Sequence, residues 1–218
     1  MTKNTIIHGD SLTELKKMAD CSIDAVITDP PYGIDFQSAW RTDSTKRHKK
    51  IANDKQPFIW WLYDAYRVTK EGGALLCFCR WDVADDFKRA IEWSGYEIKS
   101  QVIWDREHHG MGDLKGAFAP QHDIIWFATK GKFIFPNKRP KSVVSSKRLG
   151  GDKLTHPNEK PVDLMEQLIE AVTQKDDVVL DPFAGSGSTI VAANNLDRDG
   201  VGIELDGDYV TLARSRLL

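Results

Sequence analysis

The sequence predicts an α/β protein built on a mostly parallel sheet with helices on both faces. Short apolar runs that suit buried strands alternate along the chain with segments of helical spacing, the pattern typical of such a sheet. Two of these runs end in loops rich in proline or glycine, and open α/β sheets bind ligands at such strand ends. A chain of 218 residues with 41% hydrophobic content can bury one core. We therefore expect a single domain spanning residues 1–218.

Seven segments have the length and composition of strands. Several are continuous apolar runs, which suit strands buried inside a sheet. In chain order they lie at about 4–8, 23–28, 74–79, 97–104, 123–128, 177–181 and 200–204.

Five segments between them have helical spacing. Leu12, Leu15 and Met18 predict the first helix, which runs to about residue 19. The others are expected at 58–68, ending at Gly72-Gly73; at 83–91, ended by Gly95; from Pro161, a favoured first-turn residue; and from about Ile190.

The segment after the second predicted strand carries the first candidate site, Asp29-Pro30-Pro31-Tyr32. Two prolines end a strand because neither can donate to a sheet ladder. A carboxylate, a carbonyl next to a proline and an aromatic ring then stand together at the strand's carboxyl end. That combination suits a planar ring bearing an exocyclic amino group. Taken alone, the same letters also suit a simple turn.

A second candidate site follows the strand 177–181. The loop from Asp181 to Thr189 is rich in glycine, which lets backbone amides approach a ligand closely. It lacks the lysine of a phosphate-binding P-loop, and isoleucine stands where the dinucleotide fingerprint has its third glycine. Glu204 ends the next strand 23 residues after Asp181, which suits an acid that binds ribose or an ordinary surface acid. Ribose without a phosphate cradle indicates S-adenosylmethionine.

Charge is distributed unevenly along the chain, although the net charge is only −2. Residues 38–55 carry a net charge of +4 and residues 129–153 a net charge of +7. Such segments suit either phosphate-contacting arms or solvated loops. We interpret 33–56 as a basic loop beside the first site and 129–155 as a short DNA-recognition insert rather than a core element. The basic residues assigned to DNA are Arg41, Lys46, Arg47, Lys49, Lys50, Lys138, Arg139, Lys141, Lys147 and Arg148.

Other features narrow the class of protein. No apolar run approaches the ~20 residues of a membrane span, and the first residues lack the apolar region of a signal peptide. The three cysteines show no metal spacing, so we predict no metal site and an intracellular, reduced protein.

Three motifs together resemble one enzyme family. Asp29-Pro30-Pro31-Tyr32 resembles the Asp-Pro-Pro-Tyr signature of the amino-methylating DNA methyltransferases, which modify adenine N6 or cytosine N4. The loop 181–189 resembles their S-adenosylmethionine loop, and His156-Pro157-x-x-Lys160-Pro161 resembles the segment before it. The motif order is that of the permuted β group, and the resemblance covers nearly the whole chain. It implies a Rossmann-like seven-stranded methyltransferase sheet, mostly parallel with one antiparallel strand.

The resemblance also implies roles for individual residues. Asp29 and the Pro30 carbonyl would accept the hydrogens of the target amino group, Pro31 would complete the motif, and Tyr32 would stack on a base flipped out of the duplex. The residues implied for the S-adenosylmethionine pocket are Asp10, His156, Lys160, Pro161, Asp181, Pro182, Phe183, Ala184, Gly185, Ser186, Gly187, Ser188, Thr189, Glu204 and Leu205. Among these, Asp10 also suits a helix cap, which is the stronger interpretation on local grounds.

Asp before Pro-Pro-Tyr favours adenine N6 over cytosine N4. The expected substrate is double-stranded DNA with a short or relaxed site, in the cytoplasm of a bacterium or phage-infected cell, and family members often form homodimers. Methylation of RNA or of a protein glutamine, and a catalytically silent nucleic-acid-binding subunit, are the alternatives. The basic segments disfavour the glutamine alternative, and the intact motifs disfavour the silent subunit.

Overall fold

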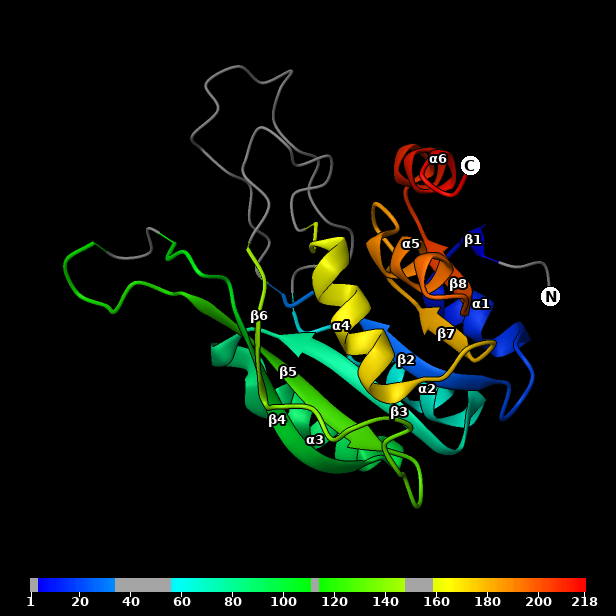
Figure 1. Ribbon diagram of the computed structural model, residues 1–218, viewed down its shortest axis with the longest axis horizontal. Coiled ribbons are helices and arrows are strands. Elements are labelled where there is room, and N and C mark those ends of the chain that lie inside the picture. Colours follow the sequence, from blue (N-terminus) through cyan, green and yellow to red (C-terminus); the bar gives the residue numbers. More distant parts are fainter. Residues whose placement is uncertain (1–3, 34–55, 111–113, 148–158) are drawn as a thin grey trace.

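One sheet of eight strands organises the part of the chain that the computed structural model describes, residues 4–33, 56–110, 114–147 and 159–218. Its spatial order is β1-β8-β7-β2-β3-β5-β4-β6 (Figure 1). The strands are β1 (Thr5–His8), β2 (Ile23–Thr28), β3 (Thr69–Cys79), β4 (Glu97–Asp105), β5 (His122–Thr129), β6 (Val143–Ser145), β7 (Val178–Asp181) and β8 (Asp199–Glu204).

All pairings in this sheet are parallel except the two that involve β5, which runs antiparallel to both β3 and β4. The expected mostly parallel sheet with one antiparallel strand is therefore confirmed. Because only β5 is reversed, the carboxyl ends of the other seven strands share one edge of the sheet. We call this the carboxyl edge and the other the amino edge.

The eighth strand, β6, was not predicted, and it lies within the segment 129–155. β6 pairs with β4 from Ile103↔Val143 to Asp105↔Ser145, and the Trp104 indole donates a 2.9 Å hydrogen bond to the Ser146 carbonyl. Before it, the Phe133 and Phe135 rings pack on Phe127 of β5, with centroids 5.4 and 5.5 Å away. The expectation that this segment is not a core element is wrong for these residues, because apolar side chains between the basic ones pack on the sheet.

Six α-helices and one 3₁₀ turn (Trp81–Val83) occur in the described residues. The helices are α1 (Ser11–Lys17), α2 (Leu62–Val68), α3 (Ala84–Ser94), α4 (Val162–Val172), α5 (Ser188–Asn195) and α6 (Gly207–Ser215). Gly95 closes α3 with φ of +111°, as predicted. Gly72-Gly73 does not end α2, because β3 begins at Thr69 and contains both glycines where its register with β2 shifts. α6 was not predicted.

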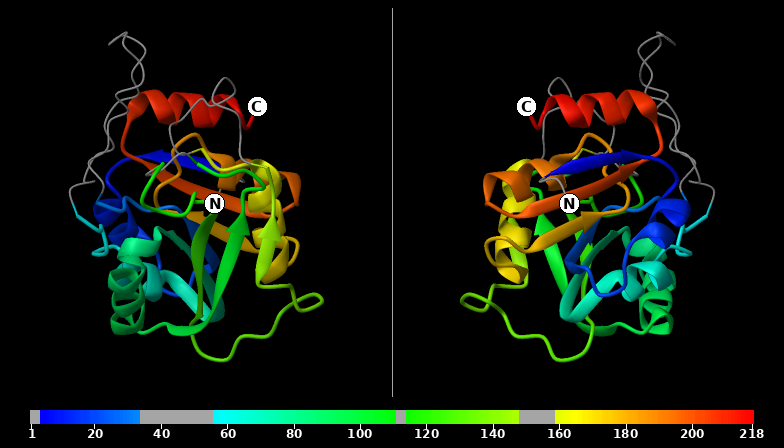
Figure 2. Two further views of the ribbon diagram at one scale, coloured as in Figure 1. Left: turned by 90° about the vertical axis from the view of Figure 1, so that its left-hand side faces the viewer. Right: turned by 90° about the vertical axis from the view of Figure 1, so that its right-hand side faces the viewer.

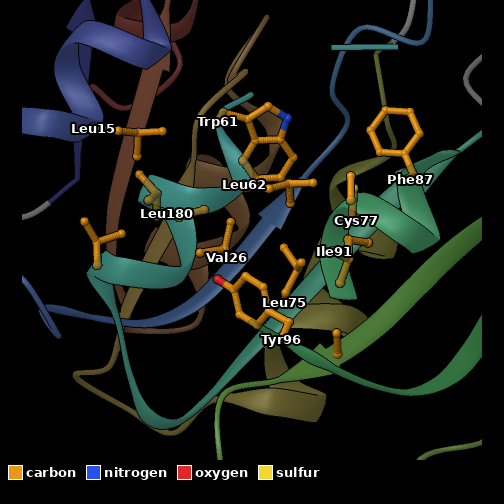
Figure 3. Close-up of a cluster of buried hydrophobic side chains, with 14 of the residues drawn as sticks. Leu15, Val26, Trp61, Leu62, Leu75, Cys77, Phe87, Ile91, Tyr96 and Leu180 are labelled. Carbon is orange, nitrogen blue, oxygen red and sulfur yellow. The ribbon is translucent and has the colours of Figure 1, made fainter. Parts of the chain in front are cut away.

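Helices cover both faces of the sheet, with α4 in front and α3 behind in Figure 1. Alternate residues of β2 point to opposite faces: Val26 packs with the cluster formed by α1, α2 and α3, whereas Ala25 and Ile27 pack with α4 and α5. Figure 3 shows the first cluster, in which Trp61 and its neighbours lie between the helices and the sheet. Each large side chain buried in this way stabilises the fold by about 1.5–3 kcal/mol.

Candidate active site

The carboxyl edge brings the predicted acids together from neighbouring strands. Asp29 follows β2, Asp181 ends β7, and Glu204 ends β8. β7 lies between β2 and β8 and pairs in parallel with both, so these three strand ends are adjacent. The Thr28 hydroxyl donates a buried 2.7 Å hydrogen bond to Asp181 Oδ1 and ties the first motif to the second.

The Asp29-Pro30-Pro31-Tyr32 motif forms a compact turn against the core. Pro30 is buried and the other three residues are partly buried. The Tyr32 hydroxyl donates to Asp29 Oδ1, and its ring meets Phe87 edge-on with centroids 6.2 Å apart. The Phe58 amide donates a 3.1 Å bond to the Pro31 carbonyl and so ties the motif to the chain before α2.

Lys160, which the resemblance implies for the S-adenosylmethionine pocket, contacts the first motif. Its ammonium donates to Asp29 Oδ2 and lies 5.1 Å from the centroid of the Phe78 ring. The two paired side chains are 12% and 17% exposed, respectively. Lys160 stands just before Pro161, the N-cap of α4, and α4 packs over β2. The packing of α4 therefore brings together two residues that are 131 positions apart in sequence.

Asp181 shapes the loop that follows it. Its carboxylate accepts hydrogen bonds from the Thr189 hydroxyl (2.5 Å), the Thr28 hydroxyl (2.7 Å) and the Phe183 amide (3.1 Å). Burial raises the pKa of Asp181 to about 6, against the effect of the three donors, and the charge of nearby Asp29 adds to the rise. A carboxylate held in this way closes the turn from β7 into α5.

Two glycines in this loop adopt backbone conformations that side chains disfavour. Gly185 and Gly187 have φ of +51° and +82°. A Cβ at Gly187 would lie 2.9 Å from the Ala213 Cβ, and a Cβ at Gly202 on β8 would lie 2.9 Å from the Ala184 Cβ. Pro182, Ala184, Ser186, Ser188 and Thr189 are buried. The closely packed loop fits a ligand that is held mainly by backbone groups, as the sequence predicts for S-adenosylmethionine.

Glu204 is fixed beside the loop. It accepts 2.8 Å hydrogen bonds from the Gly185 amide and, through its other oxygen, from the Asp206 amide. The adjacent Leu205 is 46% exposed. The Phe183 ring packs edge-on against Trp61 and Phe58, with centroids 5.5 and 5.9 Å away.

Arg216, which sequence reasoning missed, supports the same loop. Its guanidinium donates a 2.9 Å hydrogen bond to the Ser186 carbonyl and pairs with Glu159 at 2.8 Å. It caps α6, a helix with only Val210 and Ala213 buried, so the apolar periodicity that reveals a helix is weak there.

Asp10 caps α1, in agreement with the interpretation favoured on local grounds. Its carboxylate accepts a 3.1 Å hydrogen bond from the Thr13 amide. It stands two residues after β1, which pairs with β8, so it also belongs to the carboxyl edge.

The predicted DNA contacts divide into three groups. The first group lies outside the described residues and comprises Arg41, Lys46, Arg47, Lys49, Lys50 and Arg148. His156, which was expected at the S-adenosylmethionine pocket, also lies outside them. Lys138, Arg139 and Lys141 are exposed, but they belong to the connection between β5 and β6, which lies at the amino edge because β5 is antiparallel. Figure 2 shows this yellow-green connection at the lower end of the molecule. That position argues against contacts from these three residues to DNA bound at Asp29, whereas Lys147 follows β6 at the carboxyl edge.

A sheet of this topology, with a glycine-rich loop after one central strand and an acid after the next, defines a methyltransferase of the Rossmann-like class. Residues 23–215 match the family model described as DNA methylase. The chain belongs to this family of S-adenosylmethionine-dependent DNA amino-methyltransferases.

Individual relatives match nearly the full chain. YubD of Escherichia coli (strain K12), described as a methylase, is 32% identical over 97% of this chain and 88% of its own length. The crystal structure of the M1.HpyAVI–SAM complex superposes with a TM-score of 0.77 at 25% identity, covering 98% of both chains. The cytosine-N4-specific PvuII DNA methyltransferase superposes with a TM-score of 0.78 at 18% identity, covering all of this chain and 87% of the other. Within the described residues, no helix is long and apolar enough to cross a membrane.

Proposed function

We propose that this DNA methyltransferase transfers a methyl group to the exocyclic N6 of an adenine flipped out of duplex DNA. The observation that carries the proposal is the position of the Asp29 carboxylate at the end of β2, one strand away from the glycine-rich loop after β7. An acceptor for an amino group and a cofactor loop thus lie side by side at the carboxyl edge.

The chemistry of the target explains why these residue types are needed. An exocyclic amine donates its lone pair into the ring and is a poor nucleophile. When Asp29 and the Pro30 carbonyl accept its two hydrogens, the nitrogen becomes more tetrahedral and its lone pair becomes available. The bound cofactor supplies a methyl group on a positively charged sulfur, activated toward in-line attack. Positioning and electrostatics then account for catalysis, and no covalent enzyme intermediate is required.

Other residues hold the two reactants. Tyr32 offers an aromatic face for a flipped base, whose unstacking costs a few kcal/mol. Asp181 shapes the loop through the Phe183 amide, and Glu204 holds the Gly185 amide beside the expected ribose site. Asp10, Pro161 and Leu205 complete the proposed cofactor pocket.

The choice of adenine over cytosine depends on one residue of the motif, Asp29. Asp rather than Ser before Pro-Pro-Tyr favours adenine, and cytosine N4 is the second candidate. The fold does not decide between them, since the PvuII enzyme named for cytosine N4 shares it. Nucleoside analysis therefore has to distinguish the two products.

DNA contacts are proposed from the basic loop 33–56, which follows Tyr32 directly, and from Lys147 at the carboxyl edge. A short or relaxed recognition site is expected, because the segment 129–155 is short for a sequence-reading domain, and its connection between β5 and β6 lies at the amino edge. Footprinting that reveals a long, strict site contacted by one monomer would contradict this expectation. A homodimer stays a prediction that sedimentation can test.

The deciding experiment is mass spectrometry of nucleosides from unmethylated duplex DNA incubated with protein and S-adenosylmethionine. N6-methyladenine is expected, and Asp29→Ala should lower its rate of formation by about 100- to 1000-fold, since it removes a preorganised electrostatic partner. Asp20→Ala, which alters an exposed carboxylate paired with Arg67, is the matched control and should retain activity. N4-methylcytosine would overturn the choice of base, and full activity of Asp29→Ala would overturn the mechanism.

A further inference from the structure

Four basic side chains in the connection between β5 and β6 have no part in the proposed reaction. We call them the amino-edge cations: Lys132, Lys138, Arg139 and Lys141. All four are exposed, and within the described part of the chain none of their side chains forms an ion pair or a hydrogen bond. No acid occurs between residues 130 and 147 to balance them. Their positive charge is therefore available to a partner.

These cations lie far from the proposed reaction centre. β5 has eight residues and carries the chain about 24 Å from the carboxyl edge before the connection begins. Within the connection, the Asn137 side-chain amide donates a 3.2 Å hydrogen bond to the carbonyl of Glu170 in the last turn of α4. Lys160, which contacts Asp29, stands before the first turn of the same helix, about 15 Å away along the helix axis. Figure 1 shows the connection at the lower end of α4, away from that first turn. A duplex whose base reaches Asp29 therefore approaches the opposite edge of the sheet.

The backbone that carries the cations is anchored to the fold. Phe133 and Phe135 pack on Phe127 of β5, and the buried Lys130 ammonium donates to two backbone carbonyls near the end of α2. Two prolines within the connection restrict its backbone further. A charged segment held in this way loses little backbone freedom when it binds a partner.

The composition of this surface fits a polyanion. Among residues 130–142, all of which the structure describes, Ile134 is the one large apolar side chain that is exposed. The centre of a protein interface is depleted of charged residues, whereas DNA-binding surfaces are polar and positively charged. Two acids adjoin the connection, Glu71 beside Gly131 and Glu170 beside Asn137, but neither forms an ion pair with the four cations. DNA, the polyanion on which this family of enzymes acts, therefore fits the surface best.

We propose that the amino-edge cations bind the phosphate backbone of a second duplex segment, distinct from the segment whose base is methylated. Contacts to phosphates read no sequence, so this surface adds affinity without adding specificity. An enzyme that holds two segments of one long DNA can release one and remain on the other. The inference rests on the proposed function in one respect, because Asp29 marks the edge at which the target duplex binds.

The test is the capture of a labelled duplex by protein that is already bound to an immobilised duplex. Both duplexes have about 20 base pairs, far below the persistence length of about 150 base pairs, so neither can bend from one edge of the protein to the other. Wild type should capture the labelled duplex, and the logarithm of its affinity should fall against that of the salt concentration with a slope of about −3.6, or 0.9 for each of four phosphates. The neutral variant, Lys132→Gln/Lys138→Gln/Arg139→Gln/Lys141→Gln, should capture at least about tenfold less.

Two control variants separate this surface from net charge and from folding. Lys16→Gln/Lys17→Gln/Lys88→Gln/Arg89→Gln removes the same charge from exposed residues of α1 and α3 and should capture as wild type does. Lys132→Arg/Lys138→Arg/Lys141→Arg keeps the charge of the connection and should also capture normally. Methylation of a single short duplex should stay within about twofold of the wild-type rate in the neutral variant, because its changed side chains do not contact the target duplex.

Each outcome decides between interpretations. If the neutral variant captures the second duplex as well as wild type, the amino-edge cations are an ordinary solvated surface and the inference is refuted, while loss of methylation in Asp29→Ala would still support the proposed function. If methylation of a single short duplex falls as far as capture does, the cations contact the target duplex instead. Polyglutamate that binds the immobilised complex more tightly than the labelled duplex does would overturn DNA as the partner in favour of an acidic protein.

Discussion

Asp181 should make the protein less stable as the pH rises from 4 to 7, and Asp181→Asn should remove that dependence. The pKa of Asp181 is raised to about 6 in the folded protein, from an ordinary value of 3.8, chiefly because the side chain is buried. Between these two values the folded state binds more protons than the unfolded state, so the free energy of unfolding falls as pH increases. Below the lower value both states are protonated and above the higher value both are ionised, so the effect is confined to this window.

The size of the effect follows from the two pKa values. A difference of about 2 units corresponds to roughly 3 kcal/mol at neutral pH, and roughly half of this has developed by pH 5. The figure needs little correction for solvent screening because Asp181 is only 4% exposed. Urea unfolding of wild type and Asp181→Asn at pH 5 and 7.5 measures it directly. Asparagine loses part of the hydrogen bonding to Thr28 and Thr189, but this loss is the same at both pH values and cancels in the comparison.

The expected result is that Asp181→Asn gains about 1.5 kcal/mol relative to wild type between pH 5 and pH 7.5. Asp163→Asn, an exposed substitution in the first turn of α4, is the control and should follow wild type. A wild-type-to-variant difference that is constant over this range would show that Asp181 ionises normally and would refute the reasoning. The stabilised variant should nevertheless bind S-adenosylmethionine more weakly, because the Phe183 amide loses the charge that holds it.

Two other substitutions test the supports of the site. Gly187→Ala should lower the free energy of unfolding by about 1–3 kcal/mol and weaken S-adenosylmethionine binding at least tenfold. Alanine is strained at φ of +82°, and its Cβ would lie 2.9 Å from the Ala213 Cβ. Urea unfolding measures the first effect and calorimetry the second, and normal binding would contradict the proposed role of the loop. Lys130→Met should lower stability by about 2 kcal/mol or more, because the buried ammonium donates to the carbonyls of Tyr66 (3.0 Å) and Thr69 (2.8 Å) at the end of α2. The methylation rate of the folded Lys130→Met protein should not change, and a selective loss of rate would place Lys130 in the catalytic machinery.

Local sequence signals were sufficient for the strand ends that form the site. Asp29, Asp181 and Glu204 each follow an apolar run, and parallel strands place such ends at one edge of a sheet. Proline and glycine then identify which ends are loops for ligands. These signals are local, and the fold class that follows from them is confirmed.

The features that were missed depend on contacts between distant parts of the chain. Lys160 meets Asp29 only because α4 packs over β2, and no spacing in the sequence encodes that contact. Lys138, Arg139 and Lys141 look suited to DNA by composition, yet the reversal of β5 places them at the amino edge. Strand direction is set by pairing between distant segments, so composition could not predict it.

Thr28 explains how two motifs separated by 153 positions can serve one reaction. Its backbone ends β2 directly before Asp29, while its hydroxyl donates to Asp181 at the start of the glycine-rich loop 181–189. In-line transfer requires the amine and the methyl group to be held within a narrow range of distance and direction. Adjacent parallel strands fix the approximate separation of the two loops, and the buried hydrogen bond limits their remaining freedom. Asp29, the proposed acceptor, and the glycine-rich loop 181–189, proposed to hold the cofactor, therefore belong to one rigid part of the sheet.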